Sequence, residues 1–208
     1  MPMYKCLDEA IQHNETKPCK VAGCTLHRSR VSGYCRYHSN QLQKNGHPEH
    51  RAIRSTDCQG TLEKVQAVIN QNQDHKGIML GHKFFRDWMS TPHRQGYPHR
   101  QPELFQRLAE HGVSEFDLLS LSASLYVMHL NQHYKILSQK HFIYQLGYLV
   151  LSYIPHQGKI TGQTKRDVGQ FIHDNLKTLF ATIFEAIMRK EMKAEMKDQA
   201  FQSPLSIN

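Results

Sequence analysis

The stretch Cys19-Lys-Val-Ala-Gly-Cys24, followed after ten residues by Cys35-Arg-Tyr-His38, decides how the N-terminal part of this chain folds. Three thiolates and one imidazole are a ligand set that a structural Zn²⁺ takes in tetrahedral geometry. Glycines just before the second and third cysteines, Gly23 and Gly33, allow tight turns that bring the sulfurs of a short segment together. The alternative is a set of ordinary intracellular thiols. The spacing predicts one Zn²⁺ per chain, held by Cys19, Cys24, Cys35 and His38.

Together with Ser32-Gly33-Tyr34 and Asn45-Gly46-His47-Pro48, this stretch resembles a small three-Cys-one-His zinc module. Such modules stand at the N-terminus of many bacteriophage and mobile-element proteins, some of which carry an HNH nuclease downstream. Ser39 and His47 depart from the family pattern, which usually has an aromatic residue and an aspartate there. The resemblance covers roughly residues 1–50 and implies a zinc-stabilised appendage that binds nucleic acid. The rest of the chain only loosely resembles helical C-terminal regions of such phage proteins.

Positive charge gathers around the same motif. The 208-residue chain has a formal net charge of +8, and residues 17–54 contain eight Lys and Arg against Glu49 alone. A concentrated basic patch attracts the phosphate backbone, and the binding that results weakens with salt. A merely solvated basic surface is the alternative. We expect the module to contact DNA or another nucleic acid through Arg28, Arg30, Arg36, Lys44 and Arg51.

Composition narrows the class of protein. A hydrophobic fraction of 39% with 21% charged residues is typical of a soluble globular protein, and the length allows one ordinary domain plus a small one. The N-terminus lacks the apolar segment of a signal peptide, and no apolar run reaches the length of a membrane span. Together with the thiol-rich motif, this predicts a protein of the reducing cytoplasm, in a bacterial or phage-infected cell, without membrane contact.

From Thr61 onward, apolar residues recur at helical spacing. We expect a mainly α protein in which the zinc module precedes an all-helical domain of about six helices. Ser114 with Asp117 and Thr164 with Asp167 are predicted helix starts, and Gly112 a predicted helix end. The predicted parts are a lead-in (1–16), the zinc module (17–54), a linker (55–60), the helical domain (61–200) and a tail (201–208). The apolar side chains expected inside are Met79, Leu80, Phe84, Trp88, Leu119, Leu125, Leu149, Phe180 and Phe184.

No residue pattern predicts catalysis. His129 and His133 lack the glutamate of a His-Glu-x-x-His protease, and with Asn131 they share one helix, unlike the hairpin-borne histidine of an HNH nuclease. Gly158–Lys165 lacks the Gly-Lys-Ser/Thr ending of a phosphate loop. A zinc ion closed by four protein ligands also has no open position for a substrate. Three further residues are candidate substitute ligands: Cys58, His47 and His50.

These observations predict a non-catalytic, zinc-dependent nucleic-acid-binding protein of a phage or mobile element. The helical domain would then serve assembly or contact with another protein, and the apolar stripe of the last helix is a candidate surface for a partner or for self-association. The alternative is a phage or satellite interaction protein that binds a host or virion protein and uses zinc only for its structure. A nuclease is the weakest hypothesis.

Overall fold

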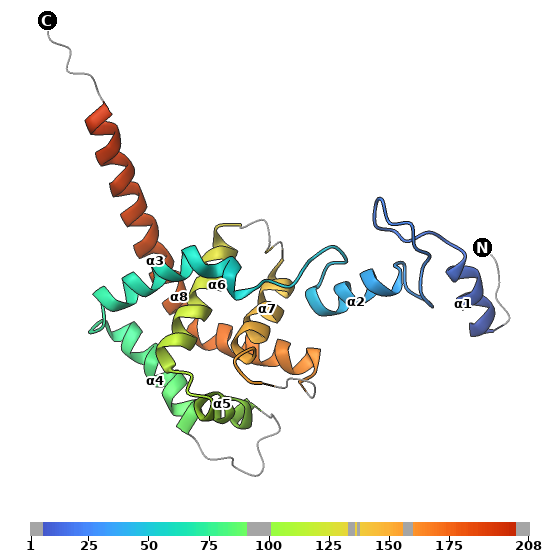
Figure 1. The fold of residues 1–208 in the computed structure, drawn as a ribbon, viewed down its shortest axis with the longest axis horizontal. Coiled ribbons are helices and arrows are strands. Elements are labelled where there is room, and N and C mark those ends of the chain that lie inside the picture. Colours follow the sequence, from blue (N-terminus) through green and yellow to red (C-terminus); the bar gives the residue numbers. More distant parts are fainter. Residues whose placement is uncertain (1–5, 91–100, 133–135, 137, 156–159, 203–208) are drawn as a thin grey trace, which may run out of the picture.

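The computed structural model describes residues 6–90, 101–132, 136, 138–155 and 160–202. Over these residues the chain is mainly α-helical without a named strand, which confirms the predicted fold class (Figure 1). The six helices expected after residue 61 are α3 to α8. The helices are α1 Leu7–Glu15, α2 Arg36–Asn45, α3 Gln59–Gln71, α4 Lys76–Ser90, α5 Gln101–Glu110, α6 Glu115–Leu130, α7 Gln139–Leu151 and α8 Gly162–Gln202, with a 3₁₀ turn, η1, at Ser55–Cys58.

Helices α3 to α8 form one body, and α1 with the loop before α2 extends to one side of it (Figure 1). Helices α6 and α7 are apolar on most faces and lie at the centre, where burial removes them from water on nearly all sides. Helix α7 packs along α8 so closely that a Cβ built on Gly147 would lie 1.8 Å from the carbonyl oxygen of Lys165. Only glycine permits this approach. The close contact fixes the first turns of α8 against α7.

Local signals explain where several helices begin and end. Ser114 caps α6: its hydroxyl accepts from the Asp117 N–H at 3.1 Å, and Asp117 Oδ2 accepts from the Ser114 N–H at 3.1 Å, as predicted. Gly112, after α5, has a φ of +74°, the left-handed conformation expected of a helix end. Helix α8 begins earlier than the start predicted at Thr164, because the hydroxyl of Thr161 accepts from the Thr164 N–H at 3.1 Å.

Seven of the nine side chains expected inside are buried or half-buried. Four of the expected side chains are buried, and three large aromatic ones are half-buried at the edge of the core. The half-buried aromatics pack against one another, as the rings of Trp88 and Phe171 show at 4.7 Å between centroids. The buried side chains are Leu119, Leu125, Leu149 and Phe180, and the half-buried ones are Phe84, Trp88 and Phe184.

The prediction was wrong for Met79 and Leu80, which are 57% and 54% exposed. Helix α4 turns Ile78, Gly81 and Phe85 to the core, and this three-and-four spacing leaves the two residues between on the outer side. Residues 55–60, predicted as a linker, instead form η1 and the start of α3, and Cys58 is fully buried in the helical core. None of the described helices combines the length and the hydropathy that crossing a bilayer requires.

Candidate metal centre

The first ligand pair lies on a tight turn between two segments of extended backbone. Pro18 and His27 form an isolated antiparallel bridge, and the N–H of Cys19 donates to the Leu26 carbonyl at 2.9 Å. Between them the N–H of Cys24 donates to the Val21 carbonyl at 3.2 Å. Gly23 has a φ of +74° at this turn, the conformation for which glycine is needed. The turn brings Cys24 back beside Cys19.

The second ligand pair is set by the start of α2. Cys35 is its N-cap residue, and the Cys35 sulfur accepts from the His38 N–H at 3.5 Å. His38 therefore lies in the first turn of the helix, on the side of the capping sulfur. The N–H of Lys20 donates to the Gly33 carbonyl at 3.1 Å, and the N–H of Cys35 donates to the Cys19 sulfur at 3.3 Å. These bonds join the two pairs.

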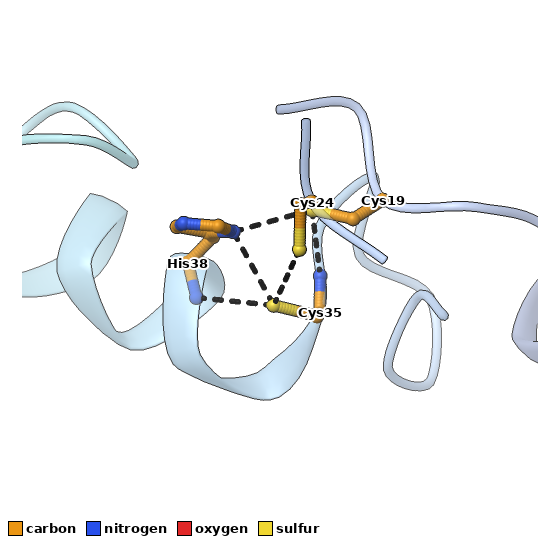
Figure 2. A group of neighbouring side chains, drawn as sticks. All are labelled: Cys19, Cys24, Cys35 and His38. Carbon is orange, nitrogen blue, oxygen red and sulfur yellow. Dashed lines mark hydrogen bonds between the residues drawn. The ribbon is translucent and has the colours of Figure 1, made fainter. Parts of the chain in front are cut away.

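The four ligand atoms form one cluster, in which every pair of atoms lies within 4.8 Å (Figure 2). The sulfurs of Cys24 and Cys35 are 3.9 Å apart, and His38 Nδ1 is 3.4 Å from the sulfurs of both Cys19 and Cys35. Zn–S bonds of about 2.3 Å and Zn–N bonds of about 2.0–2.1 Å place sulfurs about 3.8 Å apart and sulfur about 3.6 Å from nitrogen in a tetrahedron. The described side chains therefore fit a tetrahedral zinc ion, with Nδ1 as the histidine ligand.

The charge state of the cluster also fits a cation. Burial opposes ionisation of Cys19, but hydrogen bonds from the backbone of Val21 and Cys35 and from the neighbouring ligands lower the pKa of its thiol to about 6. The backbone N–H of Leu26 favours the Cys24 thiolate, yet burial and the adjacent sulfurs raise the pKa of Cys24. One thiolate thus forms readily and disfavours the next, and a divalent cation would remove this repulsion.

Burial is uneven across the four ligands. Cys19 and Cys35 are 7% and 1% exposed, whereas Cys24 and His38 are half-buried. With four protein ligands converging, a tetrahedral ion would have no position left for water or substrate. The arrangement suits a structural ion that holds two loops together.

Helix α1 supports this centre from outside, which the sequence did not indicate. The Asn14 side-chain amide donates to the carbonyls of Arg30 and Ser32 at 2.6 and 2.7 Å. Glu15 Oε1 accepts from the Arg30 N–H at 2.9 Å. Residues predicted as a lead-in therefore contain a helix whose last turn fixes the loop between the ligand pairs. Helix α1 has apolar residues at helical spacing only at Leu7, Ala10 and Ile11, a run too short to predict a helix by periodicity.

The predicted nucleic-acid contacts differ in how free their side chains are. Arg30, Arg36, Lys44 and Arg51 are exposed. Arg28 is half-buried, and its guanidinium donates to the Pro18 carbonyl at 3.0 Å and to Asn14 Oδ1 at 3.4 Å. Part of the Arg28 side chain therefore serves the module itself.

The substitute ligands lie elsewhere. Cys58 belongs to the helical core, and the rings of His47 and His141 flank that of His50 with centroids 4.6 and 4.5 Å away. Among the described residues, the Cys₃His group is the cluster whose atoms meet as metal ligands do. His129 stacks on Phe142 at 4.7 Å, while His133 lies outside the described residues.

A buried polar network joins the zinc module to the helical body. Gln145 of α7 is fully buried; its amide donates to Asn45 Oδ1 at 3.1 Å and accepts from the Ile53 N–H at 2.9 Å. Asn45 also donates to the His50 carbonyl at 2.9 Å, and His141 Nε2 lies 3.0 Å from the Arg51 carbonyl. Sequence periodicity placed Gln145 in an apolar helix but gave no sign of its partners, which are about a hundred residues away.

Comparisons with family models, with curated proteins and with solved structures find no match for this chain. The candidate site is therefore argued from its own geometry.

Proposed function

We propose that this chain is a non-catalytic, zinc-dependent nucleic-acid-binding protein. The observation that carries the proposal is the convergence of Cys19, Cys24, Cys35 and His38 at distances that suit tetrahedral zinc. Exposed basic side chains on the loop and helix that such an ion would hold supply the electrostatic part. The resemblance to zinc modules of phage and mobile-element proteins favours the same biological setting for this chain.

Zinc would act by fixing where the basic side chains stand. The four ligands bracket the loop that carries Arg30, and the last two fix the start of α2. Helix α2 carries Arg36 in its first turn and Lys44 in its last. A small module with few buried apolar groups takes much of its folding free energy from the metal. Loss of zinc would scatter these cations and reduce the attraction that they exert together on a phosphate backbone.

A specific observation also favours the interaction-protein alternative. Leu26 and Val31, on the loop between the ligand pairs, are 56% and 71% exposed, and Met79 and Leu80 are exposed on α4. Exposed apolar side chains of this size mark candidate protein contacts. Under this alternative, zinc would hold Leu26 and Val31 toward a protein partner, and nucleic acid would not bind.

Zinc stoichiometry and a salt-dependent titration test the proposal. We expect one zinc per chain by elemental analysis, and binding of a short random duplex measured by fluorescence anisotropy. Each phosphate contact contributes a slope of about −0.9 in log K against log salt, so the four exposed cations of the module alone contribute roughly −4. Absence of zinc, or absence of duplex and single-strand binding at low salt, would contradict it. The second result would favour the interaction protein.

The structure determines which variants are informative. Arg28 is a poor choice because its substitution would disturb the module. Arg30 has a φ of +51°, so Arg30→Gly removes the charge while favouring the existing backbone. We expect Arg30→Gly combined with Arg36→Gln to reduce the slope by about 1.8 units without changing zinc content. The matched control is Lys177→Gln with Lys193→Gln, which removes two exposed charges from α8 and should leave the slope unchanged.

A further inference from the structure

Four basic residues from three helices gather where α2 meets the helical body. Arg166 of α8 donates from Nη1 to the Gln43 carbonyl of α2 at 2.9 Å. A Cβ built on Gly46, just after α2, would lie 2.6 Å from the Cβ of Lys140 on α7. Lys44 stands between these two contact points in the chain, and Lys165 precedes Arg166 on α8. The cations are therefore Lys44, Lys140, Lys165 and Arg166.

No carboxylate of the described residues lies within ion-pair distance of this gathering. Burial, followed by the charge of Lys44, lowers the pKa of Lys165. The Lys165 ammonium instead lies over the ring of Tyr148, 5.0 Å from its centroid. Like charges brought together without a carboxylate repel one another, and a bound anion would relieve that repulsion.

We propose that Lys44, Lys140, Lys165 and Arg166 form a binding site for phosphate groups of a nucleic-acid backbone, so that nucleic acid held by the zinc module continues onto α7 and α8. This inference rests on the proposed function and extends its contact surface. Helix α8 contributes cations about 120 residues away from the module in sequence, as the separation of 123 between Arg166 and Gln43 shows. A repeating polyanion is the ligand that suits several separate cations at once.

The site adjoins a pocket of about 940 Å³ between α2, residues 49–57 and α7. Tyr148, which lies under Lys165, also lines this pocket, together with Arg51 and Arg54 and with the acidic Glu49 and Asp57. Tyr148 thus lies between Lys165 and the pocket that Arg51 of the zinc module also lines. A backbone that crosses the junction would meet Arg51 and Arg54 on the module side and the four cations on the other.

The geometry of the junction is held from within. The buried amide of Gln145 bonds both Asn45, at the end of α2, and Ile53, in the segment that lines the pocket. Helix α7 therefore fixes the module side of the site, while its close contact with α8 fixes Lys165 and Arg166. The distances between the cations follow from packing and do not depend on a flexible linker.

Salt-dependent titration of the zinc-loaded full chain with a short duplex and with a single-stranded oligonucleotide tests this site. Lys165→Gln with Arg166→Gln should reduce the magnitude of the duplex slope by about 1.8 units, at about 0.9 per contact. The charge-preserving pair Lys165→Arg with Arg166→Lys should keep the wild-type slope. The control pair Lys177→Gln with Lys193→Gln, whose nearer member lies about 18 Å further along α8, should keep it too.

Each of three other results would overturn the inference. If the neutral pair keeps the wild-type slope, Lys165 and Arg166 do not contact phosphate and the site across the junction fails, while the proposed function, which rests on the zinc module, stands. If the charge-preserving pair loses as much slope as the neutral pair, Lys165 and Arg166 act through packing and not through charge. If the wild-type protein binds neither oligonucleotide at low salt, both this inference and the proposed function fail.

Discussion

Replacing Gln145 by leucine should loosen the joint between the zinc module and the helical body. The side chain is fully buried on α7 and is the shared partner of two groups on the module side. Its amide donates to Asn45 Oδ1 at 3.1 Å and accepts from the Ile53 N–H at 2.9 Å. Asn45 and Ile53 are 2% and 1% exposed, so water does not replace the lost partner.

The magnitude follows from these two buried groups. A buried donor or acceptor left without a hydrogen bond costs about 1–3 kcal/mol. Two such groups, partly offset by the greater apolar burial of leucine, give a net loss of roughly 2–4 kcal/mol in the free energy of unfolding. This is a large fraction of the roughly 5–15 kcal/mol that stabilises an ordinary domain.

Urea denaturation of the zinc-loaded protein, followed by circular dichroism, measures the loss. Hydrogen exchange at the Ile53 amide localises it, since a local loss of about 3 kcal/mol speeds exchange by roughly 100-fold. The matched control is Gln170→Leu, because Gln170 is an exposed α8 residue whose amide bonds Asp174 at 2.8 Å; it should change stability by less than about 0.5 kcal/mol. Equal stability of the Gln145 and Gln170 variants would refute the reasoning.

Three further predictions concern the same region. Burial, followed by the charge of His50, lowers the pKa of His141 to about 4, against the hydrogen bond to Arg51. The folded protein thus binds this proton more weakly than the unfolded chain does, and about 3 kcal/mol of stability should be lost as pH falls from about 6.5 towards 4. In urea titrations at several pH values, the unfolding free energy of His141→Gln should lack this part of the pH dependence. If it changed with pH as steeply as in the wild type, the prediction would be wrong. Gly46→Ala should destabilise the protein by roughly 2–3 kcal/mol, because Gly46 has a φ of +76° and the new Cβ would meet Lys140. Gly60→Ala, in open space on α3, should instead stabilise it by about 0.5–1 kcal/mol. In thermal melts the melting temperature should therefore fall for the first variant and rise for the second. Chelation of zinc should disorder residues 17–38 while α3 to α8 keep their helicity, since their core cluster begins at Ile53; loss of the whole helical signal by circular dichroism would contradict this.

Patterns that act over a few residues were readable from the sequence. The ligand spacing placed Cys19, Cys24, Cys35 and His38 together, because each pair lies on its own short turn. The capping box at Ser114 and the glycine after α5 marked two helix ends, since caps are local hydrogen-bonding devices. The six helices of the second part followed from apolar spacing of three and four.

What the sequence did not reveal depends on which face of a helix meets which neighbour. Met79 and Leu80 are as apolar as the residues that α4 buries, and only the direction in which Gly81 approaches Leu179 decides the inner face. The long-range partners of Gln145 and Arg166 are on α2 and the segment after it, about a hundred residues away or more. No local pattern encodes such contacts, because they form only when α2 docks on α7 and α8.

The polar content of that docking site bears on what it is for. An interface made only of apolar side chains would stabilise the contact between α2 and α7 without this penalty, since a buried polar group costs free energy whenever its partner moves away. Here Asn45, His50, His141 and Gln145 are all buried, and their hydrogen bonds have directions as well as lengths. Such a network stabilises one orientation of the module over others. A fixed orientation matters when cations on both sides must match one ligand, as they must in the phosphate site that we propose across the junction.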